Sequence, residues 1–130
     1  MRSVYSSLAI EDNPLSLETV EKITKDKLVL AKRTDVQEVK NANELYENMD
    51  NYNYLNEEDF LKAHLLLMKY FEDDNGTYRS HDEGVKKDDE IIFMAPDSIL
   101  VPTFMNNLFI LMKIIISCTQ LFYQQHFIIT

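Results

Sequence analysis

The most regular stretch of this chain is NEEDFLKAHLLLMKYFEDDNG, residues 56–76. Its apolar residues recur at intervals of three and four, which is the period of one face of a helix. Gly76, at its end, can adopt the left-handed backbone conformation that terminates helices. We therefore predict a helix that begins after Asn56 and ends by Asp73. Its apolar face consists of Phe60, Leu61, His64, Leu65, Leu67, Met68 and Phe71.

Two short helices are predicted at the start of the chain. The first covers about residues 4–11 and stops before Pro14, because a proline excludes helical geometry from the residue before it. Ser16 is a suitable N-cap for a second helix over about residues 17–28.

A third helix is predicted over about residues 36–49. Asp35 and Glu38 have the spacing of a capping box, in which each end of the pair satisfies a free backbone N–H. The expected buried face of this helix consists of Val36, Val39, Ala42 and Tyr46. Together these helices make residues 16–73 a helical region.

A β-hairpin is predicted after the fourth helix. Two short β-prone runs, Thr77–Arg79 and Ile91–Met94, enclose a polar loop that contains Gly84. Runs of this kind around a glycine-containing loop indicate an irregular hairpin. We place it within residues 77–95, and Pro96 closes it.

A long apolar helix is predicted over residues 102–128, because Pro102 is tolerated in a first helical turn. Its polar residues form one stripe, and Lys113 is the only charged residue after position 100. A helix that is apolar nearly all round is typical of a central core helix. The upstream elements supply partners for only part of it. A membrane span is not expected, since the uncharged run 114–130 falls short of about 20 apolar residues.

The composition excludes several classes of function. The 13 basic and 22 acidic residues give a net charge of −9, which argues against binding of nucleic acid. With glycines only at positions 76 and 84, phosphate-cradling loops are absent. The single cysteine, Cys118, excludes an internal disulfide, and we expect a buried thiol and a cytoplasmic protein. His64 is expected to be a hydrogen-bonded core residue, and no metal-ligand spacing is visible.

Near the N-terminus, Ser7 and Glu11 place a hydroxyl and a carboxylate four residues apart, on one face of the first short helix. Spacing alone favours a solvated helical turn without a special role.

The surrounding residues 6–13, SSLAIEDN, resemble a known motif. It is the inhibitory-helix motif Ser/Thr-x-x-x-Glu-Gly/Asn, which precedes the catalytic core in one class of Fic-domain proteins. The order of the later segments, to about residue 109, is also similar to that family. These segments are Leu61–His64, Gly76–Arg79, Gly84-Val85, Phe93–Pro96, Val101-Pro102 and Met105–Phe109.

The resemblance implies a mostly α-helical fold, a Fic-like helical bundle with one β-hairpin flap. Many Fic proteins transfer AMP from ATP to a hydroxyl group of a target protein. By the resemblance, Glu11 would be the inhibitory glutamate and Ser7 its partner, with residues 1–13 as the inhibitory segment. Asp12 stands where the motif has Gly or Asn. The flap would hold the target by strand addition, through Thr77, Tyr78, Arg79, Gly84 and Val85.

The family's catalytic loop, H-P-F-x-[DE]-G-N-G-R, is missing from residues 1–130. We therefore expect a shortened, partial Fic domain that is inactive by itself, without catalytic residues, a bound metal or a cofactor. ATP and Mg²⁺ are implied only for an intact family member. Two alternatives remain open. One is a regulatory module that acts on an intact Fic partner, and the other is a helical scaffold that forms a homodimer through residues 102–128.

Overall fold

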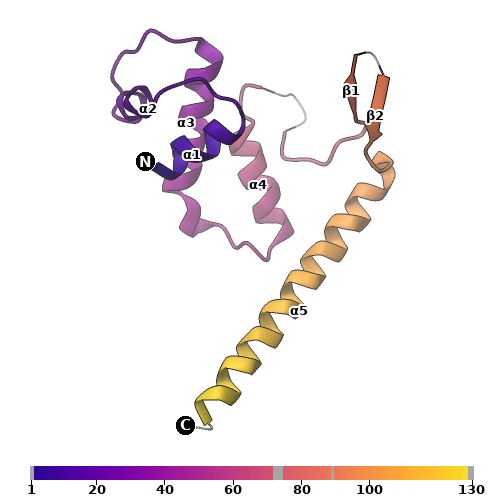
Figure 1. The fold of residues 1–130 in the computed structure, drawn as a ribbon. Coiled ribbons are helices and arrows are strands. Elements are labelled where there is room, and N and C mark those ends of the chain that lie inside the picture. The colour runs from indigo at the N-terminus through magenta and orange to yellow at the C-terminus, as the bar shows by residue number, and fades with distance from the viewer. Residues whose placement is uncertain (1, 72–74, 89, 129–130) are drawn as a thin grey trace. The chain divides into compact units, whose positions relative to one another are not determined.

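The structure, a computed structural model, describes residues 2–71, 75–88 and 90–128, with side chains as far as residue 120. The chain divides into two compact units, one of Met1–Asn53 with Glu58–Thr77 and one of Tyr54–Glu57 with Tyr78–Thr130. The elements, drawn in Figure 1, are α1 (Arg2–Ile10), α2 (Leu17–Thr24), α3 (Arg33–Glu47), a 3-10 turn η1 (Met49–Asn51), α4 (Glu57–Leu67), β1 (Gly84–Lys87), β2 (Glu90–Met94), a 3-10 turn η2 (Ser98–Leu100) and α5 (Val101–Ile128).

The first unit has a small core where α1, α2 and α3 pack against one another. Each of the three helices contributes two buried apolar side chains to it. The long face of α3 is shared by both shorter helices, as Figure 1 shows. The six core residues are Val4 and Leu8 from α1, Val20 and Ile23 from α2, and Val39 and Ala42 from α3.

The start of α2 is as predicted, and its end is earlier. The Ser16 hydroxyl accepts a hydrogen bond from the backbone N–H three residues on, at 3.2 Å, so the predicted cap is confirmed. The helix stops at Thr24 instead of Leu28 because Asp26 adopts the left-handed conformation, with φ of 54°. The N–H of Lys27 then donates to the carbonyl of Lys22 at 2.9 Å, which closes the helix end.

The predicted capping box of α3 is wrong. The helix begins at Arg33 after Lys32, so Asp35 lies in its first turn, where a negative charge suits the helix dipole. The Glu38 carboxylate accepts a hydrogen bond from the amide of Asn13 instead of a backbone N–H of its own helix. The predicted buried face is confirmed, since Val39 and Ala42 are buried and Val36 and Tyr46 pack against the core.

A buried asparagine closes the end of α4, which is shorter than predicted. The amide of Asn41 donates to the carbonyls of Leu67 and Lys69, at 2.9 and 2.8 Å. Tyr70 then takes a positive φ of 74° and stops the helix. No residue of α4 is fully buried, so its predicted apolar face is only partly covered.

The predicted left-handed turn at Gly76 is confirmed, with φ of 75°. A Cβ added there would lie 2.9 Å from the Cβ of Leu65, so the turn has no room for a side chain. The N–H of Gly76 donates to Nδ1 of half-buried His64 at 2.9 Å. This histidine is therefore hydrogen-bonded, as predicted, but it is only half-buried and does not belong to the core. Residues 72–74, where the helix end was expected, lie outside the described residues.

The hairpin of the second unit forms inside the predicted range, but its first strand differs. The residues Thr77–Arg79 form a loop, and β1 starts at Gly84 and pairs antiparallel with β2. A register shift between Val85 and Lys86 makes the pairing irregular.

The last helix, α5, is the longest, and Phe109 is the only buried residue among positions 101–120. It is therefore not a covered core helix within the described part of the chain, and Cys118, predicted to be buried, is exposed. By length and composition alone, Ser98–Gln120 includes one stretch apolar enough to cross a membrane among the residues described. The core helices of soluble proteins pass the same criterion.

Candidate functional site

The predicted motif residue Ser7 is hydrogen-bonded to a residue of α3. Its hydroxyl and the Tyr46 hydroxyl lie 2.7 Å apart and share a hydrogen bond. Tyr46 also packs against the core of the first unit. This bond fixes α1 against α3 at the level of the motif. No local sequence pattern indicates this partner, because it lies 39 positions away.

The end of α1 explains how Asp12 fits a motif position that has Gly or Asn. Asp12 takes the left-handed conformation, with φ of 61°, and the N–H of Asn13 donates to the carbonyl of Leu8 at 3.0 Å. This is the usual arrangement after a helix C-terminus, where glycine and asparagine are preferred. Aspartate also enters this backbone region more readily than most residues. The substitution therefore keeps the local geometry.

Asn13 holds this turn in place through three hydrogen bonds. Its amide donates to the Glu38 carboxylate at 2.7 Å and to the carbonyl of Asp35 at 3.3 Å. Its side-chain oxygen accepts from the N–H of Leu15 at 3.1 Å. The turn after α1 is therefore attached to the start of α3, a role for Asn13 that sequence reasoning missed.

Glu11 lies in the turn directly after α1 and is exposed. Within the described residues its carboxylate has no hydrogen-bond or ion-pair partner, whereas the backbone on both sides is fixed by the bonds above. An exposed carboxylate on a fixed turn can meet a cationic group that approaches from outside this unit.

In the second unit, Arg79 closes the base of the hairpin. Its guanidinium donates to the carbonyl of His81 at 2.7 Å, before β1, and to the carbonyl of Pro96, after β2. The backbone N–H of Ala95 donates to the carbonyl of Glu83 at 2.8 Å. This bond continues the pairing of β1 with β2 toward the base of the hairpin. Arg79 therefore holds the two ends of the hairpin together from the loop that precedes it.

Tyr78 is anchored beside it. Its hydroxyl donates to the carboxylate of Glu57 at 2.7 Å, within the same unit. Burial, and then the neighbouring Glu57 carboxylate, raise the pKa of Tyr78 to about 12. Sequence reasoning placed Tyr78 in the flap and missed Glu57, which lies 21 positions earlier.

The hairpin itself presents apolar side chains and free strand edges. The sheet has two strands in the described part of the chain, so each strand keeps one edge whose backbone groups no other strand pairs. All described residues of both strands are exposed. Gly84 is required at its position, since a Cβ there would lie 2.9 Å from both the Phe93 carbonyl and the Met94 sulfur. The exposed apolar residues are Val85, Ile91, Ile92, Phe93 and Met94, each 53–59% exposed.

The predicted site residues thus fall into two groups. Ser7 and Glu11 lie together at the end of α1 in the first unit. Tyr78, Arg79, Gly84 and Val85 belong to the hairpin and its lead-in loop in the second unit, while Thr77 ends the first unit. No group of three metal-binding side chains occurs among the described residues.

One of three comparisons with known proteins, the one with solved structures, supports this fold. Neither the protein-family models nor the curated proteins give a match. Among solved structures, the crystal structure of a Fic family protein from Desulfovibrio desulfuricans G20 is similar to this chain, with a TM-score of 0.76 and 40% sequence identity. The match covers 83% of this chain and 33% of that protein, so the chain spans about a third of its length. The chain therefore has a Fic-like helical fold with a two-stranded hairpin.

Proposed function

We propose that this chain is the regulatory and target-binding part of a Fic family protein, whose family reaction is AMP transfer from ATP to a target hydroxyl. The observation that carries this proposal is the 40% identity to a Fic family protein over 83% of the chain. At this identity the agreement extends beyond a shared arrangement of helices.

The proposed task of the hairpin is to hold an extended segment of the target protein. Its two free edges can accept a further strand through main-chain hydrogen bonds, and its exposed apolar side chains can contact alternate residues of that strand. The bonds of Arg79 and Tyr78 fix the base of the hairpin before a target arrives.

The proposed task of Glu11 is inhibition through an ion pair with an arginine of a Fic catalytic loop. Support comes from its exposed carboxylate on a fixed turn and from the left-handed Asp12, which preserves the geometry of the motif. Residues 1–130 contain no H-P-F-x-[DE]-G-N-G-R loop. The arginine would therefore come from residues outside this range or from a separate Fic partner.

A mixing experiment tests this role. The chain is added to an active Fic enzyme whose own inhibitory glutamate has been replaced, and AMP transfer is followed with labelled ATP and Mg²⁺. We expect no transfer by residues 1–130 alone and a concentration-dependent loss of the enzyme's activity. Glu11→Gln should abolish that loss, whereas Glu44→Gln, an exposed glutamate on α3, should retain it. Equal inhibition by both variants, or AMP transfer by the chain alone, would contradict the proposal.

A second candidate function is self-association through α5, which is favoured by its exposed apolar side chains. Phe104, Leu108, Leu111 and Ile115 are each 44–53% exposed. Light scattering over a range of protein concentrations tests it, since a homodimer predicts a rising mass and a constant monomer mass excludes it.

A further inference from the structure

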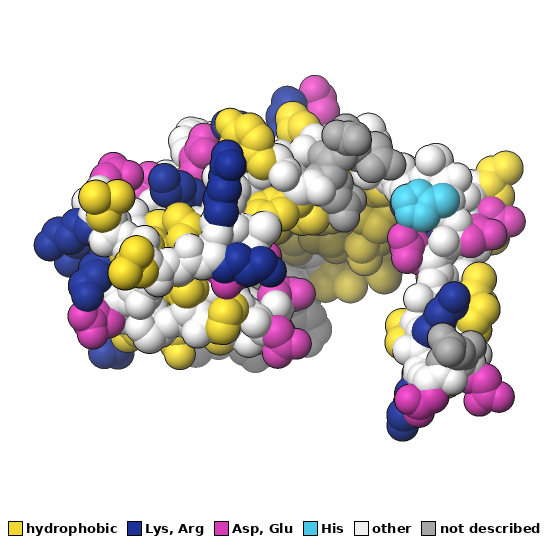
Figure 2. Space-filling view, turned by 90° about the horizontal axis from the view of Figure 1, so that it is seen from above, with side chains coloured by type: hydrophobic (Ala, Val, Ile, Leu, Met, Phe, Trp, Pro, Cys, Tyr) yellow, Lys and Arg dark blue, Asp and Glu magenta, His cyan; other side chains and the backbone are white. Residues whose placement is uncertain are grey.

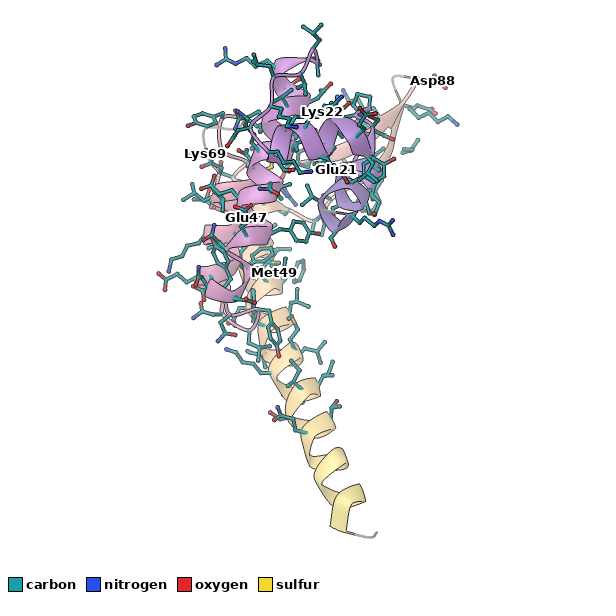
Figure 3. All side chains as sticks on the ribbon, turned by 90° about the vertical axis from the view of Figure 1, so that its left-hand side faces the viewer. Glu21, Lys22, Glu47, Met49, Lys69 and Asp88 are labelled. Carbon is teal, nitrogen blue, oxygen red and sulfur yellow. The ribbon has the colours of Figure 1, made fainter. Side chains whose placement is uncertain are left out.

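The loop between α2 and α3 differs from the rest of the molecule in both charge and apolar exposure. We name residues 25–33, KDKLVLAKR, the basic–leucine loop. It contains four of the 13 basic residues and one of the 22 acidic residues, a net charge of +3. The remainder of the chain therefore carries −12. Glu21 and Lys22, labelled in Figure 3, lie on α2 just before the loop begins.

Two leucines in this loop are completely exposed. Leu28 and Leu30 have relative exposures of 102% and 107%, which are the highest values among the exposed large apolar residues of the described chain. Val29, between them, is partly buried and packs against the core of the first unit. Val29 thus anchors a segment without regular secondary structure, while the leucines on either side of it stay in solvent.

The cations of the loop are not neutralised by the protein. Lys25, Lys27, Lys32 and Arg33 are exposed, and none of them forms an ion pair within the described residues. Asp26 is the only acidic residue between positions 22 and 34. Figure 2, which views the first unit from above, shows several Lys and Arg side chains and protruding hydrophobic ones on this face, with Asp and Glu side chains among them. The two fully exposed leucines thus have cationic side chains, without ion-pair partners in the described part of the chain, before and after them in the sequence.

We propose that the basic–leucine loop attaches this protein to the surface of a membrane that contains anionic lipids. In that arrangement the two leucines enter the acyl boundary, while the cations contact lipid phosphates and carboxylates at the level of the headgroups. A lipid surface accepts protruding side chains without a matching pocket, whereas a protein partner would need a concavity for both leucines. This inference is independent of the proposed Fic function.

The acidity of the rest of the chain does not oppose this attachment. At physiological ionic strength, charges farther than about 8 Å from the contact are largely screened. The local +3 of the loop then determines the interaction, and the acidic remainder disfavours attachment through other faces. Lys40 on the neighbouring α3 is exposed and lies with Lys27 around one hollow, which adds to the local positive charge.

A fluorescent reporter tests insertion of the loop directly. The chain has no tryptophan, so Leu30→Trp introduces a single indole. The control is Ile10→Trp, because Ile10 is 80% exposed but is followed by Glu11 and Asp12. Both proteins are mixed with vesicles of phosphatidylcholine, with and without phosphatidylserine, prepared with and without brominated acyl chains.

We expect the tryptophan at position 30 to shift to shorter wavelength, and brominated lipid to quench it severalfold, only when phosphatidylserine is present. The tryptophan at position 10 should respond to neither vesicle. Failure of either protein to bind the anionic vesicles would overturn the proposal. Binding without quenching at position 30 would also overturn it, because the vesicle would then be held by another part, such as α5.

Substitutions in the loop separate the contribution of the leucines to membrane binding from that of the lysines. Leu28→Ser with Leu30→Ser, and separately Lys25→Gln with Lys27→Gln, should each weaken sedimentation with anionic vesicles at least tenfold. Lys86→Gln with Lys87→Gln in β1 changes the net charge equally and should leave it unchanged. All replaced side chains are exposed, so circular dichroism should show an intact fold. Equal binding by all variants, or binding to polyglutamate but not to vesicles, would overturn the lipid assignment in favour of another partner.

Discussion

The two units of this chain differ in how many apolar side chains they bury. In the first unit, three helices bury six apolar residues against one another, and Asn41 is the one buried polar residue among the described residues. In the second unit, the hairpin and α5 carry apolar side chains that stay in solvent, and Phe109 is the only buried one among its described residues. The first unit therefore has a core of its own, and the second has almost none.

This difference indicates which interactions stabilise each unit. A two-stranded hairpin is marginally stable by itself in water, and a helix gains most of its stability from packing of its apolar face. The hairpin is instead organised at its base by hydrogen bonds of Arg79 and Tyr78. Exposed apolar patches mark surfaces that meet a partner. The exposed apolar side chains of the second unit therefore support the proposed target binding by its hairpin.

The largest predicted effect is a charge placed in the core of the first unit. Val39 is fully buried, and Val39→Asp should lower the free energy of unfolding by about 4 kcal/mol, since an unpaired buried charge is very costly. Urea unfolding followed by circular dichroism measures this. The matched change in the second unit is Ile114→Asp, at a half-exposed position, which should change stability by less than about 0.5 kcal/mol. Similar losses in both variants would show that α5 is packed in solution.

A second comparison uses the two glycines. Gly76→Ala should cost about 2 kcal/mol, because alanine is disfavoured at a φ of 75° and its Cβ would collide with Leu65. Gly84→Ala should disturb the hairpin through contact with Phe93 and leave the unfolding of the first unit unchanged. Amide hydrogen exchange distinguishes the two results. Loss of protection in α1–α3 after Gly84→Ala would contradict the separation of the units.

The sequence predicted the helical elements of this fold well, because the apolar period is a local signal, although the Asp35–Glu38 capping box was wrong. The Ser16 cap, the Val39 and Ala42 face and the Gly76 turn were all confirmed. The helix ends were less accurate. Asp26 and Tyr70 stop their helices in left-handed conformations, which neither residue type strongly predicts.

The surroundings of the predicted site residues could be inferred only in part, because their partners lie far away in the sequence. The spacing of Ser7 and Glu11 is local and visible in the sequence. Their environment depends on Tyr46 and Glu38, which are brought close only by packing of α1 on α3. Likewise, Glu57 reaches Tyr78 across 21 positions. The exposure of Cys118 was missed because the apolar run around it was taken to indicate a buried core helix, whereas the described part of α5 is mostly exposed.

A smaller effect is expected at the turn that carries Glu11. Asn13→Ala removes three hydrogen bonds and should cost about 1 kcal/mol of stability, since its partners can turn to water. Asn43→Ala removes one exposed bond to Glu47 and should be nearly neutral. If Asn13 positions Glu11, its replacement should also weaken the inhibition of an active Fic enzyme severalfold. Unchanged inhibition by Asn13→Ala would separate the turn from the proposed regulatory role.

The smallest effect concerns the base of the hairpin at high pH. Because burial and the Glu57 carboxylate raise the pKa of Tyr78 from 10.0 to about 12, the folded hairpin keeps the phenol proton after an unfolded chain has lost it. Its stabilising contribution is therefore complete below pH 10 and is lost as the pH rises toward 12. Phenolate absorbance during alkaline titration should show a component near 12 that disappears in Tyr78→Phe and shifts to lower pH in Glu57→Gln. Tyr54→Phe, an exposed tyrosine of the same unit, should retain it. If the component survives Tyr78→Phe, it does not arise from Tyr78, and the Tyr78–Glu57 bond does not order the base of the hairpin.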